Sequence, residues 1–412
     1  MVRAAKHTSR DIRVANRFHV LRHILAAPAV SRQEIAAETA LSFATVSNLI
    51  GELLALGLLV EVGFQDSGGG RPRGLVAVNP GGGFLIGIDT AETYVHVDLF
   101  DAALTVLATV EERLSGGERC PEQIVERLVS GVGTVMAQAG VAPDGVLGVG
   151  VSVPGQVDHE GGVSVFAPNW DWLDVPLRGM LRSRLPMPVH LDNPLRASAV
   201  AELWFGAGRG HDDLAVLTLG TGVGAGLALG GSLYRGVTNS AGEWGHTTLV
   251  LGGRPCRCGN RGCVETYVGA PGIMQHLREV APDNPMLCPG DQTATIEALA
   301  AGLAAGDPVA VAVADVTAGY LAAAIADLVN LLNPEVVVLG SWVAAKLGQG
   351  LLARVRDRVA GHALRRPLDA TQIVLGQASG DAVSLGAATF ALERFLASIG
   401  APLGGVVRPV RR

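Results

Sequence analysis

The 412-residue sequence predicts an N-terminal winged helix-turn-helix followed by a larger α/β body. Helical spacing of apolar residues occurs three times between Ile12 and Gly57 and then gives way to two short strand-like runs. From Phe84 onward, strand-like runs alternate with helical ones. The charge follows the same division, since residues 1–80 carry a net charge of +3 and residues 81–412 carry −9. Only the front part is therefore suited to an anionic polymer.

The composition is that of a folded globular protein. Hydrophobic residues make up 49% of the chain and charged residues 17%, which excludes a disordered chain. The first thirty residues contain Arg and His throughout, so no signal peptide is expected. The apolar residues 319–343 are interrupted by polar residues and are expected to form a buried helix and strand. We expect a soluble, cytoplasmic protein with no membrane span.

The N-terminal elements have defined starts and ends. Ser31 and Glu34 form the pattern of a capping box, in which hydroxyl and carboxylate satisfy backbone N–H groups at the start of a helix. Ser42 can cap the next helix, and Gly57 permits a left-handed exit from it. The helices are expected over residues 14–25, 31–39 and 42–57, and the strands over residues 58–62 and 75–78. Three helices, a tight turn and a hairpin predict the winged helix-turn-helix.

The third of these helices carries short polar side chains near its start. In a winged helix-turn-helix this helix enters the major groove, where such side chains reach base edges and an alanine contacts a thymine methyl. Two arginines on the expected wing are suited to phosphate or minor-groove contacts. The candidate DNA-binding residues are Ser42, Ala44, Thr45, Ser47, Asn48, Arg71 and Arg73. The alternative is a three-helix packing module or linker that does not touch DNA.

In the body, several strand-like runs end in glycines. The strands are expected over Phe84–Asp89, Val95–Phe100, Val146–Val153, Val189–Leu191, Leu214–Leu219 and Glu335–Leu339. The segments Leu219–Gly231 and Val338–Ser341 are expected to be glycine-rich turns from strand to helix. Such turns let backbone N–H groups approach an anionic ligand, although ordinary tight turns have the same composition.

Four metal-ligating side chains lie within eighteen residues: His246, Cys256, Cys258 and Cys263. Three thiolates and an imidazole are the ligands of a Cys3His zinc site, and nearby glycines provide the bends that bring them together. Since all four ligands come from the protein, the zinc is expected to be structural. Cysteines concentrated in this way suit a metal site in a reducing compartment better than a disulfide framework. The alternative is that the three cysteines are unligated core residues.

The pattern Gly-Glu-X-Gly-His followed by Cys-X-Cys-Gly-X-X-Gly-Cys-X-Glu, within Ala241–Glu265, resembles the signature of the ROK family (repressor, open reading frame, kinase). Val153–Asp158, Ala167–Trp170 and the turn Gly220–Gly222 extend the resemblance over nearly the whole chain. The family contains sugar kinases and sugar-responsive transcription factors, and the latter carry a DNA-binding front. The resemblance implies an actin-like (ribonuclease H-like, sugar kinase) two-lobed body with a sugar site, assembled as a homodimer or homotetramer.

These expectations give a division of the chain into three domains. Residues 1–80 form the winged helix-turn-helix, and residues 81–195 form the first lobe of the body. A C-terminal helix over residues 381–400 is expected to complete this lobe, and residues 196–380 form the second lobe with the zinc loop.

The resemblance also shows where the chain departs from the kinases. Glu92 stands in the first phosphate loop, where its charge opposes nucleotide binding. The kinase segment Glu-Asn-Asp-Ala-Asn corresponds to residues 192–196, in which Pro194 takes the place of the aspartate base and Arg196 that of the last asparagine. Proline cannot accept the sugar hydroxyl proton, and Trp342 could fill the purine pocket. The chain is therefore expected not to be an enzyme.

The sugar side of the site is better preserved. By resemblance, the sugar-binding residues are Gly155, Asn169, Asn193, Glu243, His246 and Glu265. Their carboxylate, amide and imidazole groups match sugar hydroxyls. An alternative for Glu243 and Glu265 is that they only brace the zinc loop.

Together these features predict a regulator that binds operator DNA and is controlled by a sugar or sugar derivative in a degenerate kinase site. Two alternatives remain at this point. One is an active ATP-dependent sugar kinase, and the other is a regulator controlled by a protein partner.

Overall fold

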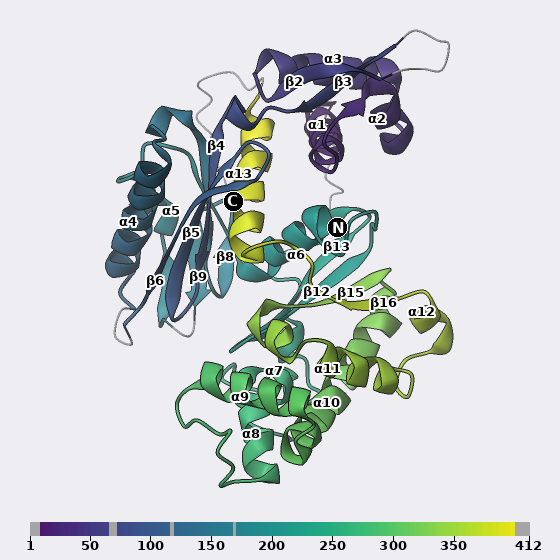
Figure 1. Ribbon diagram of the computed structural model, residues 1–412. Coiled ribbons are helices and arrows are strands. Elements are labelled where there is room, and N and C mark those ends of the chain that lie inside the picture. The colour runs from purple at the N-terminus through teal and green to yellow at the C-terminus, as the bar shows by residue number, and fades with distance from the viewer. Residues whose placement is uncertain (1–8, 66–71, 116–118, 168–169, 400–412) are drawn as a thin grey trace. The chain divides into compact units, whose positions relative to one another are not determined.

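The computed structural model describes residues 9–65, 72–115, 119–167 and 170–399 (Figure 1). Contacts divide the chain into two units. The first contains residues 1–151, 176–191 and 387–412, and the second contains residues 152–175 and 192–386. Each unit is therefore built from segments that are far apart in the sequence.

The N-terminal part of the first unit contains the three predicted helices. They are α1 (Ser9–Leu25), α2 (Arg32–Thr39) and α3 (Phe43–Ala55), and the strands are β1 (Val30–Ser31), β2 (Leu59–Gln65) and β3 (Arg73–Val78). The strands form an antiparallel sheet in the order β1-β3-β2. The predicted capping box at Ser31 and Glu34 is confirmed, and Gly57 has φ of +74° after α3.

The body of the first unit is a five-stranded sheet in the order β11-β7-β4-β5-β6. Its strands are β4 (Phe84–Thr90), β5 (Tyr94–Asp101), β6 (Val106–Arg113), β7 (Val146–Ser152) and β11 (Val189–Asp192). The helices are α4 (Pro121–Ala139), α5 (Leu177–Arg182) and α13 (Ala382–Ser398). At Gly150 a Cβ would lie 1.8 Å from the carbonyl oxygen of Ala387, so glycine permits the close approach of α13 to β7.

The second unit contains two sheets. The larger has the order β14-β13-β12-β15-β16, with strands β12 (Leu214–Leu219), β13 (Val223–Leu229), β14 (Ser232–Leu233), β15 (Val336–Gly340) and β16 (Gln372–Leu375). The smaller has the order β10-β9-β8, with strands β8 (Gln156–Asp158), β9 (Val163–Ala167) and β10 (Trp172–Val175). The helices are α6 (Pro194–Phe205), α7 (Glu265–Val268), α8 (Ala270–Val280), α9 (Gln292–Ala305), α10 (Pro308–Leu332), α11 (Ser341–Val359) and α12 (Arg365–Asp369).

The glycine-rich segment after β12 differs from the sequence prediction. The turn at Gly220–Gly222 leads into the antiparallel strand β13 and not into a helix. A Cβ at Gly226 would lie 2.2 Å from the carbonyl oxygen of Leu195, so the glycines of β13 admit α6 against the sheet. The other predicted turn, at the end of β15, does lead into a helix, α11.

Among the described residues, α10 is the one helix that is long and apolar enough to cross a membrane by length and composition. More than half of its apolar window, 56%, is buried inside the protein. Val313, Leu321 and Ile325 lie in the core of the second unit, as expected for a central core helix.

Candidate functional site

The four predicted metal ligands converge in the second unit. The ligand atoms of His246, Cys256, Cys258 and Cys263 all lie within 4.8 Å of one another. The Sγ atoms of Cys258 and Cys263 are 3.7 Å apart, and His246 Nδ1 lies 3.6 Å from Cys256 Sγ. Two sulfurs bound tetrahedrally to zinc at about 2.3 Å are about 3.8 Å apart. The donor set and its spacing therefore fit a zinc ion.

Two backbone features shape the metal loop. Gly259 and Gly262 have φ of +91° and +79°, in the left-handed region that favours glycine. A Cβ at Gly262 would also lie 1.7 Å from the carbonyl oxygen of Val250. His246 ends the short 3-10 turn η3 (Trp244–His246), which is anchored where Trp244 Nε1 donates to the carbonyl of Ala324 at 3.2 Å.

Ionisation is opposed at two of the three thiols. Burial raises the pKa of the Cys256 thiol to about 12 and also raises that of Cys263, whereas at Cys258 burial is outweighed by the hydrogen bonds from the backbone of Asn260 and from the other two cysteines, which lower the pKa. A bound divalent cation supplies the positive charge that keeps such sulfurs as thiolates. The cluster is thus suited to a cation and poorly suited to three free thiolates.

The two glutamates next to the metal cluster have different environments. Glu265 Oε2 accepts the backbone N–H of Val223 at 3.0 Å, and its Oε1 lies 3.9 Å from Cys256 Sγ. Burial raises the pKa of Glu243, while the charges of His246 and Arg196 oppose that rise. Glu265 therefore braces the metal loop, whereas Glu243 is a half-buried carboxyl that is influenced by the charge of the buried Arg196.

A second polar cluster is formed where β11 meets α6. Asn193 caps α6 by accepting the N–H of Arg196 at 3.1 Å. Asp192 Oδ1 accepts from Arg196 Nε at 2.7 Å, and Asp192 Oδ2 accepts from Arg235 Nη1 at 2.6 Å. Burial alone would raise the pKa of Asp192, but Arg235 and Arg196 hold it below its usual range. Asp192 is thus a buried anion shared by two guanidinium groups.

The predicted sugar-binding residues that the structure describes all lie in the second unit. Asn193 Nδ2 lies 3.5 Å from the carbonyl oxygen of Gly155, which links these two residues. Gly155 has φ of +85°, and a Cβ there would lie 2.1 Å from the carbonyl oxygen of Phe166. Glu243 and Glu265 instead adjoin the metal cluster, and Asn169 lies outside the described residues.

Sequence reasoning missed the roles of Arg196 and Arg235. The signal available for Arg196 was its position, where the kinases of the family carry asparagine. Arg235 had no such signal, because its partner Asp192 lies 43 positions earlier in the chain.

In the N-terminal part, the predicted DNA-binding residues lie mainly on the exposed face of α3. Ser42 caps the helix by accepting the N–H of Thr45 at 3.1 Å. Ala44 and Asn48 are exposed, and Thr45 and Ser47 are partly exposed. The opposite face carries the buried residues Val46, Leu49, Ile50 and Leu53. Arg73 is exposed at the start of β3, and Arg71 lies outside the described residues.

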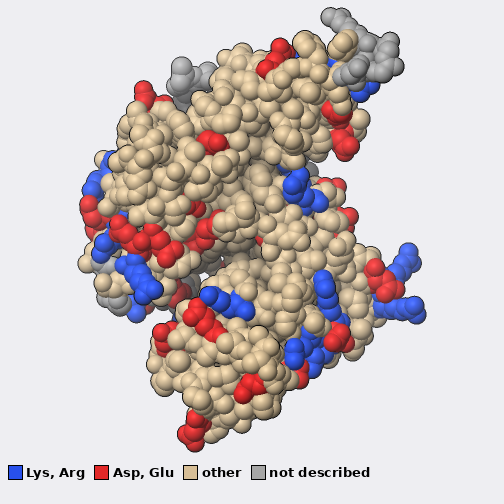
Figure 2. Space-filling model, in the orientation of Figure 1, with Lys and Arg blue, Asp and Glu red and all other residues tan. Residues whose placement is uncertain are grey.

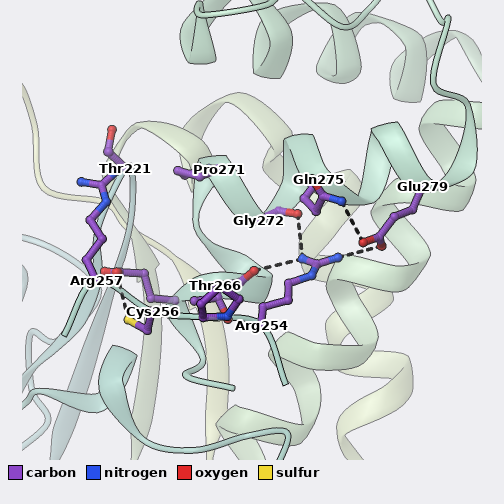
Figure 3. A pocket seen from close by; sticks show the side chains of 11 residues that line it. Thr221, Arg254, Cys256, Arg257, Thr266, Pro271, Gly272, Gln275 and Glu279 are labelled. Carbon is purple, nitrogen blue, oxygen red and sulfur yellow. Dashed lines mark hydrogen bonds and ion pairs between the residues drawn. The ribbon is translucent and has the colours of Figure 1, made fainter. Parts of the chain in front are cut away.

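A cavity of about 390 Å³ adjoins the metal loop. Arg254 Nη1 donates to the carbonyls of Thr266 at 3.0 Å and Gly272 at 3.3 Å, and Nη2 donates to Glu279 at 2.7 Å. Figure 3 shows Thr221 at one end of this cavity and Glu279 at the other. Arg254 therefore ties the metal loop to α8, and its donors are used within the protein.

Charges on the drawn face of the molecule are mixed. Figure 2 shows basic and acidic side chains interspersed, with large neutral areas between them. In the second unit, Lys346 pairs with Glu297 at 2.7 Å, and Arg354 and Arg358 pair with Asp315 at 2.9 and 2.8 Å. Such paired charges are poorly suited to holding a nucleic-acid backbone.

Comparison with known proteins assigns the class. The profile described as "ROK family" matches residues 85–394. A putative xylose repressor from Caldicellulosiruptor sp. (strain Rt8B.4) is 32% identical over 94% of this chain and 97% of its own. The chain belongs to the ROK family.

Solved structures assign the branch of the family. A ROK family transcriptional regulator, a homolog of the E. coli MLC protein, has a TM-score of 0.77 and 26% identity over 94% of this chain and 97% of its own. A Streptomyces griseus ROK glucokinase, solved with glucose and AMPPNP, has a TM-score of 0.65 and 30% identity, and covers 76% of this chain and 100% of its own. The chain is a transcriptional regulator of the family, because the repressor and the regulator match nearly its whole length.

Proposed function

We propose that the chain binds operator DNA through its N-terminal part and that a sugar or sugar derivative, bound in the second unit, controls this binding. The observation that carries the proposal is the exposed polar face of α3, in a chain that a repressor matches over 94% of its length. The named xylose repressors make D-xylose the first effector to test.

The N-terminal elements support the DNA-binding half of the proposal. Three helices followed by the β2–β3 hairpin have the order of a winged helix-turn-helix. With α3 in the major groove, Thr45, Ser47 and Asn48 reach base edges, and Ala44 contacts a thymine methyl. Arg71 and Arg73 belong to the wing and contact phosphates.

The second unit supports a regulator without phosphoryl transfer. Pro194 is the first residue of α6, where the family's kinases carry the aspartate base, and it has no group that accepts a proton. Asp192 is held as an anion by two arginines and is therefore a poor base. Trp342 Nε1 lies 3.1 Å from the position of a Cβ on Gly220, so the indole lies against the turn that would meet a nucleotide.

We assign zinc to the Cys3His cluster as a structural ion, since four protein ligands leave no open position. The division proposed for the chain is a DNA-binding domain over residues 1–80, a first lobe over 81–195 with helix 381–400, and a second lobe over 196–380. A homodimer or homotetramer acting in the cytoplasm would place two DNA-binding parts on one operator.

Control by the effector requires two conformations with different affinity for DNA. A sugar that contacts Glu243 also acts on the turn that carries His246, and hence on the metal loop. It shifts the equilibrium only to the extent that it binds one conformation more tightly than the other.

Fluorescence anisotropy of labelled operator DNA tests the proposal. We expect D-xylose or a related sugar to change the apparent dissociation constant for operator by about tenfold or more, with no ATP-dependent phosphorylation of the sugar. An Asn48→Ala variant is the matched control for operator recognition. Operator binding that no sugar alters would instead indicate control by a protein partner, and ATP-dependent turnover would indicate a kinase.

A further inference from the structure

Arg196 is a buried cation with unused donors. The residue is 1% exposed, and its Nε donates to Asp192 at 2.7 Å. Its Nη1 and Nη2 atoms are buried and have no hydrogen-bond partner among the described residues. A guanidinium carries five N–H donors in a fixed plane, so four of them face no acceptor in the described part of the chain.

Asp192 cannot supply the missing acceptors. Its Oδ1 already accepts from Arg196 Nε and from the backbone N–H of Asn193 at 2.9 Å, and its Oδ2 accepts from Arg235. Asp192 is thus fully engaged by Arg196 Nε, Arg235 and the Asn193 backbone. Unsatisfied donors on a buried charged group are costly, so a partner in at least one functional state is expected.

Arg196 adjoins two of the predicted sugar-binding residues, Asn193 and Glu243. Arg196 lies in the first turn of α6, three residues after Asn193, and its charge acts on the carboxyl of Glu243. Asp192 holds the Nε edge, which fixes the orientation of the guanidinium and leaves the Nη1–Nη2 edge for another partner. This edge has the geometry that binds two adjacent oxygen atoms.

We propose that Arg196 is a specificity-determining residue whose Nη1–Nη2 edge binds two adjacent oxygen atoms of the effector. The chemistry that satisfies it is a carboxylate, as in a sugar acid, or a pair of neighbouring hydroxyls on a neutral sugar. This inference rests on the proposed function. Nη1 and Nη2 are both enclosed, so the effector reaches them only when the protein changes conformation. Binding of the effector is then coupled to that conformational change, as control of DNA binding requires.

The test is calorimetric titration of the full-length, zinc-loaded protein. The probes are D-xylose, D-glucose, D-xylonate and D-gluconate, each measured with the wild type and with Arg196→Lys. Lysine keeps the charge and can still pair with Asp192, but it lacks the two-pronged edge. The control is Arg356→Lys, an exposed arginine of the same unit that donates from Nε to the carbonyl of Ile373 at 2.8 Å.

We expect Arg196→Lys to weaken binding of the preferred probe by about tenfold or more, and Arg356→Lys to leave it within about threefold. Preference for the acids, reduced by salt, identifies a carboxylate as the partner, whereas equal or tighter binding of the neutral sugars identifies hydroxyls. An Arg196→Lys variant that binds the probes like the wild type overturns the inference. Such a result is expected if a fixed water, and not the effector, is the partner of the Nη1–Nη2 edge.

A second measurement covers the case in which Arg196→Lys does not fold. The wild type is titrated with monodeoxy analogues of the bound sugar, and removal of either of two adjacent oxygens should weaken binding by about tenfold. Losses spread evenly over the ring would overturn the role of Arg196 and leave the proposed function standing. If no probe binds and none alters operator affinity, the sugar-controlled function and this inference fail together.

Discussion

Two regions of the molecule are rich in polar side chains but are built in opposite ways. One is the second unit, with its metal cluster and the polar cluster around Asp192. The other is the start of α3 in the first unit. In the second unit the polar atoms are directed at one another, as where the buried carboxylate of Asp192 pairs with Arg196 and Arg235, although Cys258 of the metal cluster is exposed. On α3, Asn48 and Ala44 are exposed, and buried apolar residues on the opposite face hold the helix.

The difference separates stability from recognition. Changes to the second-unit clusters should lower the free energy of unfolding, because they leave buried charges or thiols without partners. Changes to the exposed face of α3 should lower affinity for DNA and leave stability unchanged. The division would fail if a change in a second-unit cluster left the free energy of unfolding unchanged, or if a change on the exposed face of α3 lowered it.

Loss of the metal should have the largest effect. We expect chelation or Cys258→Ser to destabilise the second unit by about 5 kcal/mol or more, because structural zinc contributes on the order of 10 kcal/mol in small zinc peptides. This corresponds to a fall in Tm of about 10 °C or more. Scanning calorimetry with and without chelator measures it.

The control for the metal prediction is Cys288→Ser, since Cys288 lies outside the metal cluster. It should change Tm by a few degrees at most. An unchanged Tm after complete removal of zinc would show that packing, and not the cation, holds the loop.

Removal of the carboxylate of Asp192 should cause the second-largest loss of stability. Asp192→Asn leaves the buried guanidinium of Arg196 and the partly buried one of Arg235 without their anion and should cost about 3–5 kcal/mol of unfolding free energy at pH 7. Because the folded-state pKa of Asp192 is lowered, its contribution is present above the usual aspartate pKa of 3.8 and is lost as the pH falls through the lower folded-state value. Urea denaturation of both proteins from pH 7 downward measures this.

The difference in stability between wild type and Asp192→Asn should stay constant from pH 7 to about 5 and shrink only below about 4. Asp315→Asn is the matched control, since the side chain of Asp315 is 41% exposed although it also pairs with two arginines. It should cost less than about 1 kcal/mol. Equal costs for the two variants would mean that burial does not distinguish these clusters.

Truncation of a side chain on the exposed face of α3 should change DNA affinity and leave stability unchanged. Asn48→Ala should weaken operator binding by about 1–3 kcal/mol and leave the free energy of unfolding within about 0.5 kcal/mol. Ser42→Ala provides the contrast, because loss of the helix cap should cost about 1 kcal/mol of stability. Anisotropy on operator and scrambled DNA, together with urea denaturation, separates the two effects.

The smallest effect is expected from a substitution in the wing, and it should be a loss of DNA affinity. Arg73→Ala should weaken binding to operator and scrambled DNA alike and lower the salt dependence by about one phosphate contact. Anisotropy over a range of salt concentrations measures the slope. A loss confined to operator DNA would indicate that Arg73 reads bases.

Local sequence signals predicted the elements whose physics is local. The capping box at Ser31 depends on residues three positions apart, and strands such as β12 and β15 are continuous apolar runs. Strands β6, β13 and β16 were missed. Strand β6 is largely exposed, β13 is rich in glycine, and β16 is short. Their strand geometry depends on the neighbours with which they pair.

The sequence by itself determined the family, the helices of the N-terminal part and the four residues of the candidate metal cluster. Their order and spacing along the chain carry that information. Only the tertiary structure decided that Asp192 is shared by two arginines and that no described residue pairs with the Nη1–Nη2 edge of Arg196. The physical reason is that the pairing of buried charges depends on which segments fold together and exclude water, and no local pattern specifies that.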